Sequence, residues 1–400
     1  MMVGRLLLPP SYFSCPCLSP EAIKEYADVG VQSAETLIHK AALVGGTYDW
    51  QLYKYESEVK MYKQRGRRAL ERPSRYCGVM QVVGKLDEYI DLYRYDTTDQ
   101  ARAYFRRFGG AYVDVAVLHT IAPCRPDRPN DATRIKWCLL QSPLATVKRD
   151  FVILETDLEF QVDGKRAWVR AYRSIDLAGF PDTRQELHCR RGRMYDMGHV
   201  VVESDRPGYL DLTYVADMDI HSTAPAWLVD LSFKLWLRSM SEIDWFMREN
   251  RLSQSPFRRS SQLEPLTSCS TCSLCRHKFG LLRKRTNCFK CGDVVCRACN
   301  RRWNVKIDGY NVRIRACLPC SLAVAAWTPT SSRSTTAPQP SILFKTPLRA
   351  LLERRENGDA VDDDDGDAVQ SADQSSDRQV NPIMLNTHST RGLPHEDHPK

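Results

Sequence analysis

The sequence contains no run of about 18 apolar residues, the length that a membrane-spanning helix requires. Its first apolar stretch, residues 6–8, is followed by two prolines and is too short for the apolar core of a secretory signal. We therefore expect a cytoplasmic protein with no transmembrane helix.

Motifs of common catalytic sites are also missing. The sequence has no phosphate-binding loop, no dinucleotide-binding glycine motif and no nucleophile elbow. The histidines of the first 250 residues, His119, His188, His199 and His221 among them, are spread along the chain without a motif. We therefore expect a protein that is not an enzyme.

Cysteine, in contrast, is abundant and unevenly placed. Nine of the 15 cysteines lie between Cys269 and Cys320. A disulfide framework would spread an even number of cysteines through a small secreted domain, whereas paired cysteines in a reducing compartment usually bind metal. The pattern therefore indicates a metal-binding segment.

The positive charge is concentrated in the same segment. Residues 269–320 contain 12 lysines and arginines against two acidic residues, a net charge of +10, whereas residues 321–400 carry −4 and residues 1–268 carry +2. Two zinc ions and eight thiolates would leave the segment near +6. Such a basic unit favours an anionic surface, either phospholipid or nucleic acid.

Hydrophobic periodicity divides the first 250 residues into a helix, a series of strands and a closing helix. Helical spacing covers 20–43, and strand-like runs follow at 50–62, 76–83, 112–121, 133–141, 150–160, 167–177, 194–203 and 209–216. Short helices are expected at 85–93 and 98–108, and one long amphipathic helix at 226–250. This order predicts an α+β fold in which an antiparallel sheet curls around a long C-terminal helix.

The remaining segments differ in composition. Residues 251–268 are polar, lack periodicity and are interpreted as a linker. Residues 328–400 are rich in Ser, Thr, Pro, Asp and Gln, with four consecutive aspartates at 362–365, and are expected to form a disordered tail. The predicted boundaries are therefore 20–250 for the large domain, 251–268 for the linker, 269–322 for the finger and 328–400 for the tail.

The metal-binding segment contains four CxxC pairs separated by 12, 4 and 17 residues. The predicted ligands are Cys272, Cys275, Cys288, Cys291, Cys296, Cys299, Cys317 and Cys320. Two pairs complete one tetrahedral four-cysteine zinc site, so eight ligands predict two closed, structural Zn²⁺ ions with no open position for catalysis. The short gap between the second and third pairs favours an interleaved arrangement, in which pairs one and three share one ion and pairs two and four share the other.

This segment resembles a FYVE zinc finger. The resemblance covers about 270–322 and is carried by the pair spacing, by the apolar run 279–282 before basic residues, by Lys284-Arg285 before Cys288, by Gly292 after Cys291, and by Arg315 before Cys317. Members of that family bind phosphatidylinositol 3-phosphate on endosomal membranes, and the resemblance implies the same kind of partner here.

The basic motif departs from the family pattern. Thr286 and Asn287 stand where the family has two histidines, and Phe289 stands where it has an arginine. The family's Trp-x-x-Asp before the first pair is absent, and Ala316 replaces the usual valine. Because histidine supplies directional bonds and a pH response, we expect weaker, less selective and less pH-dependent membrane binding.

The resemblance still suggests which residues contact the membrane. Arg283, Lys284, Arg285 and Arg315 are the predicted lipid head-group contacts, since cationic donors bind phosphate. Leu281 and Leu282 are the predicted membrane-inserting residues, with packing against the finger as the alternative.

The large domain resembles a START-type lipid-binding domain of the helix-grip fold. The resemblance rests on the order of elements, on the strand opening at 148–151, on Ser174 ending another strand, and on the helix opening at 225–228. It implies an internal cavity for one apolar lipid. The tryptophans and tyrosines of the domain could equally line this cavity or form an ordinary core. The alternative to a cavity is an interior filled by side chains.

The leading interpretation is a non-enzymatic membrane adaptor or lipid sensor, peripheral to the membrane and endosomal. The alternative is a protein-interaction scaffold whose finger binds a protein partner and not lipid. A RING-type ligase fits poorly, because all eight ligands are cysteine and the middle gap is four residues. Nucleic-acid binding is disfavoured, because few aromatic residues accompany the charges.

Overall fold

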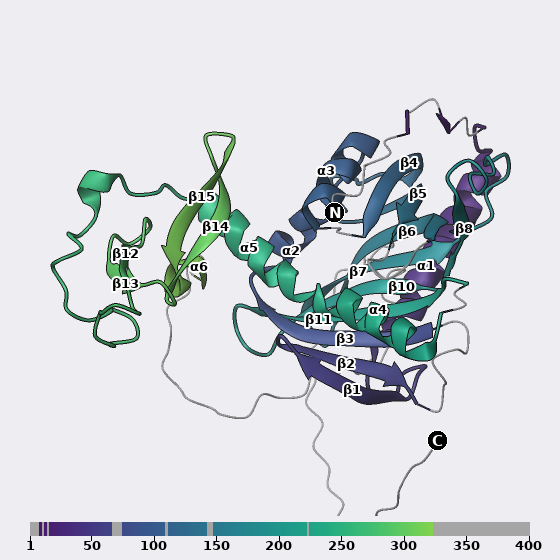
Figure 1. The fold of residues 1–400 in the computed structure, drawn as a ribbon. Helices are drawn as coiled ribbons and strands as arrows, with labels where there is room; N and C mark the ends of the chain where they lie inside the picture. The colour runs from purple at the N-terminus through teal and green to yellow at the C-terminus, as the bar shows by residue number, and fades with distance from the viewer. Residues whose placement is uncertain are drawn as a thin grey trace, which may run out of the picture. The chain divides into compact units, whose positions relative to one another are not determined.

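The computed structural model describes residues 8–9, 12–13, 16–65, 74–108, 111–141, 147–221 and 224–322 (Figure 1). The predicted tail at 328–400 lies outside these residues. None of the described helices is long and apolar enough to cross a bilayer.

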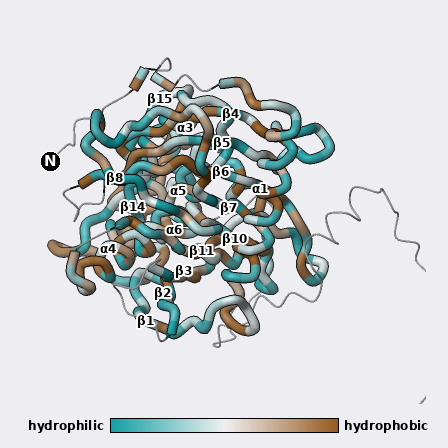
Figure 2. The backbone as a smooth tube through the Cα atoms, turned by 90° about the vertical axis from the view of Figure 1, so that its right-hand side faces the viewer, coloured by the Kyte–Doolittle hydropathy of each residue, from teal (hydrophilic) through white to brown (hydrophobic). Residues whose placement is uncertain are grey.

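Eleven strands of the described chain form one sheet. The main path runs β1-β2-β3-β11-β10-β7-β6-β5-β4, every pairing along it is antiparallel, and Figure 2 shows these strands in succession. The strands are β1 (Trp50–Glu56), β2 (Val59–Gln64), β3 (Ser74–Val83), β4 (Tyr112–Ala122), β5 (Ala132–Leu140), β6 (Lys148–Val162), β7 (Lys165–Ser174), β10 (Met197–Glu203) and β11 (Tyr209–Asp219). Short β8 (Cys189–Arg191) pairs with β6, and β9 (Arg193–Met194) pairs with β11.

The aromatic run at 50–62, predicted as one strand, is instead the hairpin of β1 and β2. Ser57 and Glu58 form its turn with positive φ angles of 53° and 67°. Two consecutive residues in the left-handed region match the twist of a two-residue hairpin turn. Neither residue is glycine or asparagine, so the usual sequence signal for the turn is missing.

Alternation along the strands gives the sheet two buried faces. In β10, Val200 and Val202 lie in one core and Val201 lies in another. Helix α1 (Pro20–Ala41), capped by the Ser19 hydroxyl 3.2 Å from the Ala22 amide, covers the first face through Leu37 and its neighbours. Strands covered on both faces read as nearly continuous apolar runs, which explains why the sequence indicates them clearly.

The opposite face is covered by two helices where one was predicted. Helix α4 (Ala226–Arg238) and helix α5 (Ser241–Ser253) are separated at Ser239 and Met240. The Ser239 and Ser241 hydroxyls donate to the Trp236 and Arg238 carbonyls at 2.6 and 2.8 Å. Such back-bonding competes with the helical hydrogen bonds and interrupts the helix.

Gly78 of β3 and Gly84, the residue that follows this strand, let these helices approach the sheet closely. A Cβ atom on Gly78 would lie 2.5 Å from the Met240 sulfur, and one on Gly84 would lie 2.2 Å from the Met247 methyl group. Both methionines are buried in the core beneath the helices. The short helices α2 (Leu86–Leu92) and α3 (Thr98–Phe108) agree with the prediction.

The finger is built from two small hairpins and one short helix. Strands β12 (Arg285–Asn287) and β13 (Val294–Cys296) pair, β14 (Asn300–Ile307) pairs with β15 (Tyr310–Cys317), and α6 (Leu318–Leu322) follows. The segment predicted as a linker is in contact with it, since the amides of Arg258 and Glu264 donate to the carbonyls of Phe289 and Gly292 at 2.7 and 3.2 Å. A one-turn 3-10 helix, Ser260–Gln262, lies within that segment.

Candidate functional site

The eight predicted ligands gather into two groups of four cysteines. One group joins Cys272 and Cys275 with Cys296 and Cys299, and in each group all four sulfur atoms lie within 4.8 Å of one another. The other group contains Cys288, Cys291, Cys317 and Cys320. Pairs one and three therefore share one site and pairs two and four the other, which confirms the interleaved arrangement.

The sulfur spacing fits zinc. Four sulfurs at about 2.3 Å from a tetrahedral ion lie about 3.8 Å apart. The Cys275 and Cys296 sulfurs are 3.8 Å apart, and those of Cys291 and Cys317 are 4.0 Å apart. Each site is closed by four ligands, so the two ions hold the finger together and offer no position for water activation.

Local backbone geometry prepares the sulfurs to carry negative charge. The amides of Cys296 and Cys317 donate to the sulfurs of Cys272 and Cys288 at 3.3 and 3.2 Å. Gly292, with φ 90°, follows the Cys291 ligand and donates its amide to the Cys288 carbonyl at 2.8 Å. Hydrogen bonds from amides stabilise thiolate, which is the form that binds zinc.

Helix α5 completes the core of the finger. The Trp245 ring stacks on Trp303 of β14 with centroids 4.0 Å apart, and Leu252 is buried in the same cluster. The Glu249 carboxylate accepts from the Trp245 indole at 2.9 Å and from the Asn304 amide at 2.7 Å. The sequence did not reveal this contact, because the apolar periodicity of 226–250 indicates one face and not what packs against the other.

Two residues of the predicted basic motif, Arg283 and Arg285, contact other groups of the finger. The Arg283 guanidinium contacts the Cys275 sulfur at 3.6 Å. Arg285 donates to the Cys269 carbonyl at 3.2 Å and lies over the Phe279 ring. Lys284 is exposed.

The two residues that replace the family histidines are held by structural hydrogen bonds. The Thr286 hydroxyl donates to the Val295 carbonyl at 2.8 Å and accepts from the Asn300 amide at 2.9 Å. The Asn287 side chain donates to the Glu264 carbonyl at 2.7 Å. Both side chains therefore serve the finger's own packing.

Leu281 and Leu282 form a bare apolar tip. Their exposed fractions are 95% and 104%, so neither packs against the finger. The tip lies between the Gly280 and Arg283 backbones, which exchange hydrogen bonds at 3.1 and 3.3 Å and close a tight turn. Two adjacent exposed leucines beside cations are typical of a surface that enters a lipid headgroup layer.

The lysines and arginines of the finger far outnumber its two acidic residues. No lysine or arginine of residues 269–320 forms an ion pair within 4.0 Å in the described part of the chain, as the recorded pairs all lie in the larger domain. Arg315 donates to the Asn300 carbonyl at 2.7 Å. Its pKa is lowered by burial and by the neighbouring charges of Arg302 and Arg297.

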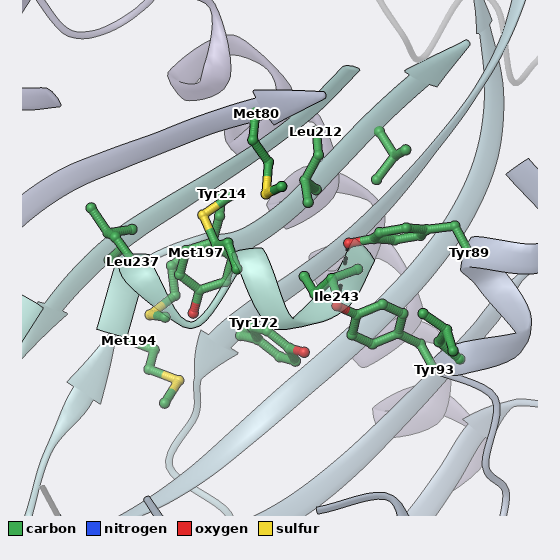
Figure 3. Close-up of a cluster of buried hydrophobic side chains, with 14 of the residues drawn as sticks. Met80, Tyr89, Tyr93, Tyr172, Met194, Met197, Leu212, Tyr214, Leu237 and Ile243 are labelled. Atoms are coloured by element: carbon green, nitrogen blue, oxygen red, sulfur yellow. Dashed lines mark hydrogen bonds between the residues drawn. The ribbon is translucent and has the colours of Figure 1, made fainter. Parts of the chain in front are cut away.

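The region between the sheet and the closing helices is a core of buried tyrosine, methionine and leucine side chains. Figure 3 shows Tyr89, Tyr93, Tyr172 and Tyr214 directed toward one another with several methionines around them. The Tyr89 hydroxyl lies 2.9 Å from Nδ1 of His199, and burial together with the charge of Arg170 lowers the pKa of His199 to about 3. This histidine is therefore neutral near neutral pH.

A buried ion cluster lies on the same face of the sheet. Arg170 forms a two-point pair with Asp157 at 2.6 Å for each bond, and Lys136 pairs with Glu155. Burial alone raises the pKa of Glu155, but the charges of Arg170 and Lys136 outweigh it and hold this pKa at about 2. This cluster was not predicted, although charged residues at alternate positions of otherwise apolar strands are a sequence signal for it.

The aromatic residues that the sequence left undecided fall into different cores. Trp168 and Tyr172 belong to the core beneath the closing helices, with Trp236 packed against it. Trp137 lies in a separate core with the N-terminal segment, and Trp245 belongs to the finger's core.

Together the two four-cysteine sites define a two-zinc finger, attached to a domain with an antiparallel sheet and closing helices. Residues 262–326 match the family model of the FYVE zinc finger, which confirms the resemblance. A curated relative, arrestin domain-containing protein D of Dictyostelium discoideum, is 38% identical over 61 residues. The match covers 15% of this chain and only 8% of that relative.

Solved lipid-transfer domains are similar to the larger domain. Human StAR-related lipid transfer protein 5 shares 17% identity at a TM-score of 0.41, covering 55% of this chain and 95% of its own. A STAR-related lipid transfer protein from Xanthomonas axonopodis shares 18% identity at a TM-score of 0.33, covering 48% of this chain and 98% of its own.

Proposed function

We propose that this protein is a non-enzymatic membrane adaptor or lipid sensor whose zinc finger docks on an anionic, phosphoinositide-containing membrane. The observation that carries the proposal is the Leu281–Leu282 tip, fully exposed beside a finger whose cations have no acidic partners among the described residues. Apolar insertion and electrostatic attraction act together at a membrane surface. Each cation near such a surface contributes about 1 kcal/mol.

We further propose that the larger domain holds a lipid between its sheet and its closing helices. The support is the apolar, methionine-rich composition of this core, which also contains tyrosine hydroxyls, His199 and the ion cluster. An apolar site with a few fixed polar groups suits a ligand with an apolar body and one polar end. The endosomal location inferred from the family resemblance is part of the same proposal.

The test is sedimentation of the zinc-loaded full chain with vesicles at physiological salt. The full chain is needed because a fragment beginning near residue 260 would lack Trp245 and Leu252, which belong to the finger's core. Three compositions are compared: phosphatidylcholine alone, phosphatidylcholine with phosphatidylserine, and phosphatidylcholine with one phosphoinositide at a time. We expect binding to the anionic vesicles, strongest for a phosphoinositide.

The double variant Leu281→Ser, Leu282→Ser identifies the surface. It should retain two zinc ions and the wild-type melting temperature, since neither side chain packs against the protein, but lose most vesicle binding. Two apolar side chains contribute about 3 kcal/mol when fully buried, which corresponds to a loss of about 100-fold. Wild-type binding to no vesicle would contradict the proposal and favour the alternative, a finger that docks a protein partner.

A further inference from the structure

Helix α4 carries apolar side chains on two opposite sides, although only one side packs on the sheet. Val229, Phe233 and Leu237 point inward and are buried in the core beneath the closing helices. On the outer side, Trp227 is 66% exposed and Leu235 is 37% exposed. Helices with apolar side chains all round are normally buried all round. The outer side of α4 therefore lacks the cover that its composition calls for.

The outer apolar residues of α4 form a continuous stripe. Trp227, Leu231 and Leu235 follow one another at intervals of four, so they lie one above the other along the helix. Leu231 is half-buried between its two more exposed neighbours. These three residues are named the outer stripe, and they lie on a helix that borders the β1–β2 hairpin (Figure 1).

The charges beside the outer stripe are already neutralised. Lys234 and Arg238 of α4 both pair with Glu56 of β1, at 2.8 and 3.4 Å. Asp230, the remaining charged residue of α4, pairs with Lys63 of β2 at 3.0 Å. A surface that enters an anionic membrane combines apolar residues with cations that attract lipid headgroups. The neutral border of the stripe therefore favours a peptide over a membrane as its cover.

The size of the outer stripe favours a segment of the same chain over a second copy. A stable interface between two proteins buries about 800 Å² on each partner and involves about 20–30 residues a side. Three side chains on one helix are far from that size. A segment of the same chain needs less contact area, because its connection keeps it at an effective concentration of about 1 mM.

One segment beyond the described residues has the matching pattern. Residues 342–344 are Ile-Leu-Phe, and the Thr-Pro pair at 346–347 is typical of a helix start. Leu348, Leu351 and Leu352 then stand at the spacing of one helix face. The polar composition around such a segment does not fold by itself, but an apolar segment within it can fold against a partner surface.

The chain is long enough to bring this segment to α4. The last described residues belong to α6, where the Ser321 carbonyl accepts from Arg251, near the end of α5, at 3.1 Å. From Arg251 back to Leu235 the distance along the two helices is about 24 Å. The 20 residues between Leu322 and the segment can span up to about 65 Å. The segment therefore reaches the whole outer stripe.

We propose that residues 342–356 of this chain cover the outer stripe of α4, in the way that an amphipathic helix lies against an apolar groove. The apolar side of the segment, Leu348, Leu351 and Leu352, would contact Trp227 and Leu235. This contact is independent of the proposed membrane docking, because the outer stripe and the leucine tip of the finger are separate surfaces.

Hydroxyl-radical footprinting of the full chain, read by mass spectrometry, measures how well Trp227 is covered. Tyr310 of the finger, which is 76% exposed, is the internal reference. The test variant is Leu351→Ser, Leu352→Ser, which removes apolar side chains from the proposed contact. The matched control is Ile383→Ser, Leu385→Ser, which removes two apolar side chains from another part of the C-terminal region.

We expect the test variant to oxidise at Trp227 about fivefold to tenfold faster than wild type. With an effective concentration of about 1 mM and a Kd of about 0.1 mM, the segment would cover the stripe about nine-tenths of the time. The control variant should react at Trp227 within about twofold of wild type, and Tyr310 should react equally in all three proteins.

The reciprocal variant, Leu235→Ser, tests the contact from the side of the helix. It removes an apolar partner of the segment, so hydrogen exchange of the amides of residues 348–356 should rise about fivefold. Exchange that is already as fast in wild type as in the variant would contradict the proposal.

Three outcomes of the footprinting overturn the inference. Equal oxidation of Trp227 in wild type and in the test variant would show that this segment does not cover the stripe. Protection that grows with protein concentration would assign the stripe to a second copy of the chain. Protection that appears only when phosphatidylserine vesicles are added would assign it to a membrane. None of these results decides the proposed function, which the vesicle sedimentation of the leucine-tip variant tests separately.

Discussion

Cys269 stands three positions before Cys272, yet its sulfur belongs to neither group of four. Its sulfur lies 3.5 Å from the Ser268 hydroxyl instead. Ligand identity is therefore decided by where the backbone turns, and proximity in sequence does not suffice. Substitution of Cys269, which is not a ligand, is therefore a control for substitution of the ligand Cys288.

Cys288→Ser should remove one zinc ion and unfold the finger, because a serine hydroxyl does not replace a thiolate and structural zinc contributes on the order of 10 kcal/mol to folding. Cys269→Ser should leave two ions in place. Native mass spectrometry of both variants counts the bound metal. Two ions in Cys288→Ser would show that the grouping of ligands is wrong.

His199 makes the larger domain sensitive to acid. Its pKa of about 3 lies below the unfolded value of about 6.5, so the unfolded chain takes up the proton first as pH falls. The contribution of neutral His199 to the free energy of unfolding is therefore fully present above about pH 6.5. It falls by about 2 kcal/mol between about pH 6.5 and about pH 5.

His199→Gln should flatten this dependence, since glutamine can still bond the Tyr89 hydroxyl but does not titrate. Urea unfolding of wild type and variant at about pH 7 and pH 5 provides the comparison. An equal loss of stability in both proteins would assign the acid response to other groups facing the same interior, Glu155 and Asp157 first among them.

At the scale of elements, α5 belongs to two cores at once. Ile243 and Met247 are buried against the sheet, and Trp245 and Leu252 contact the finger. Arg251 makes the connection polar as well, donating to the Ser321 carbonyl of α6 at 3.1 Å, to the Val83 carbonyl of β3 at 2.9 Å and to Glu88. We therefore expect a substitution that destabilises one of these cores to destabilise the other as well.

Trp245→Ala should destabilise the finger by about 3 kcal/mol, because it removes the ring stacked on Trp303 and leaves a cavity. Trp227→Ala on α4 is the control, as that ring is 66% exposed. The rate of zinc release to a chelator measures the effect. A similar rate for both variants would mean that the stacking is not needed to hold the finger.

The elements themselves were largely predictable from sequence, and their junctions were not. Helix α1 and strands β4 to β7 carry strong apolar periodicity, and the eight cysteines have a spacing that allows few alternatives. The break at Ser239 depends on tertiary packing. The turn at Ser57 depends on two residues in the left-handed region, neither of which is glycine. The ion cluster around Arg170 was missed because buried charges are rare and each needs partners on other strands.

For the whole molecule, zinc occupancy should control the order of the closing helix. Removing zinc with a strong chelator should unfold the finger and raise amide exchange in α5, because α5 loses the Trp303 stack and the Ser321 contact. Exchange in β5 to β7 should change little, since those strands lie within the sheet. Hydrogen exchange with and without chelator provides the measurement. Unchanged protection of α5 would contradict the role of this helix in both cores.

A helix held in common also limits how the finger can be reused. A chimera that moves residues 262–326 onto another protein carries all eight cysteines but leaves Trp245, Glu249 and Leu252 behind. The transplanted cassette would expose the Trp303 face of its hairpin to water and would tend to aggregate. The portable unit in this protein therefore starts at Ser241, inside the helix that closes the neighbouring domain.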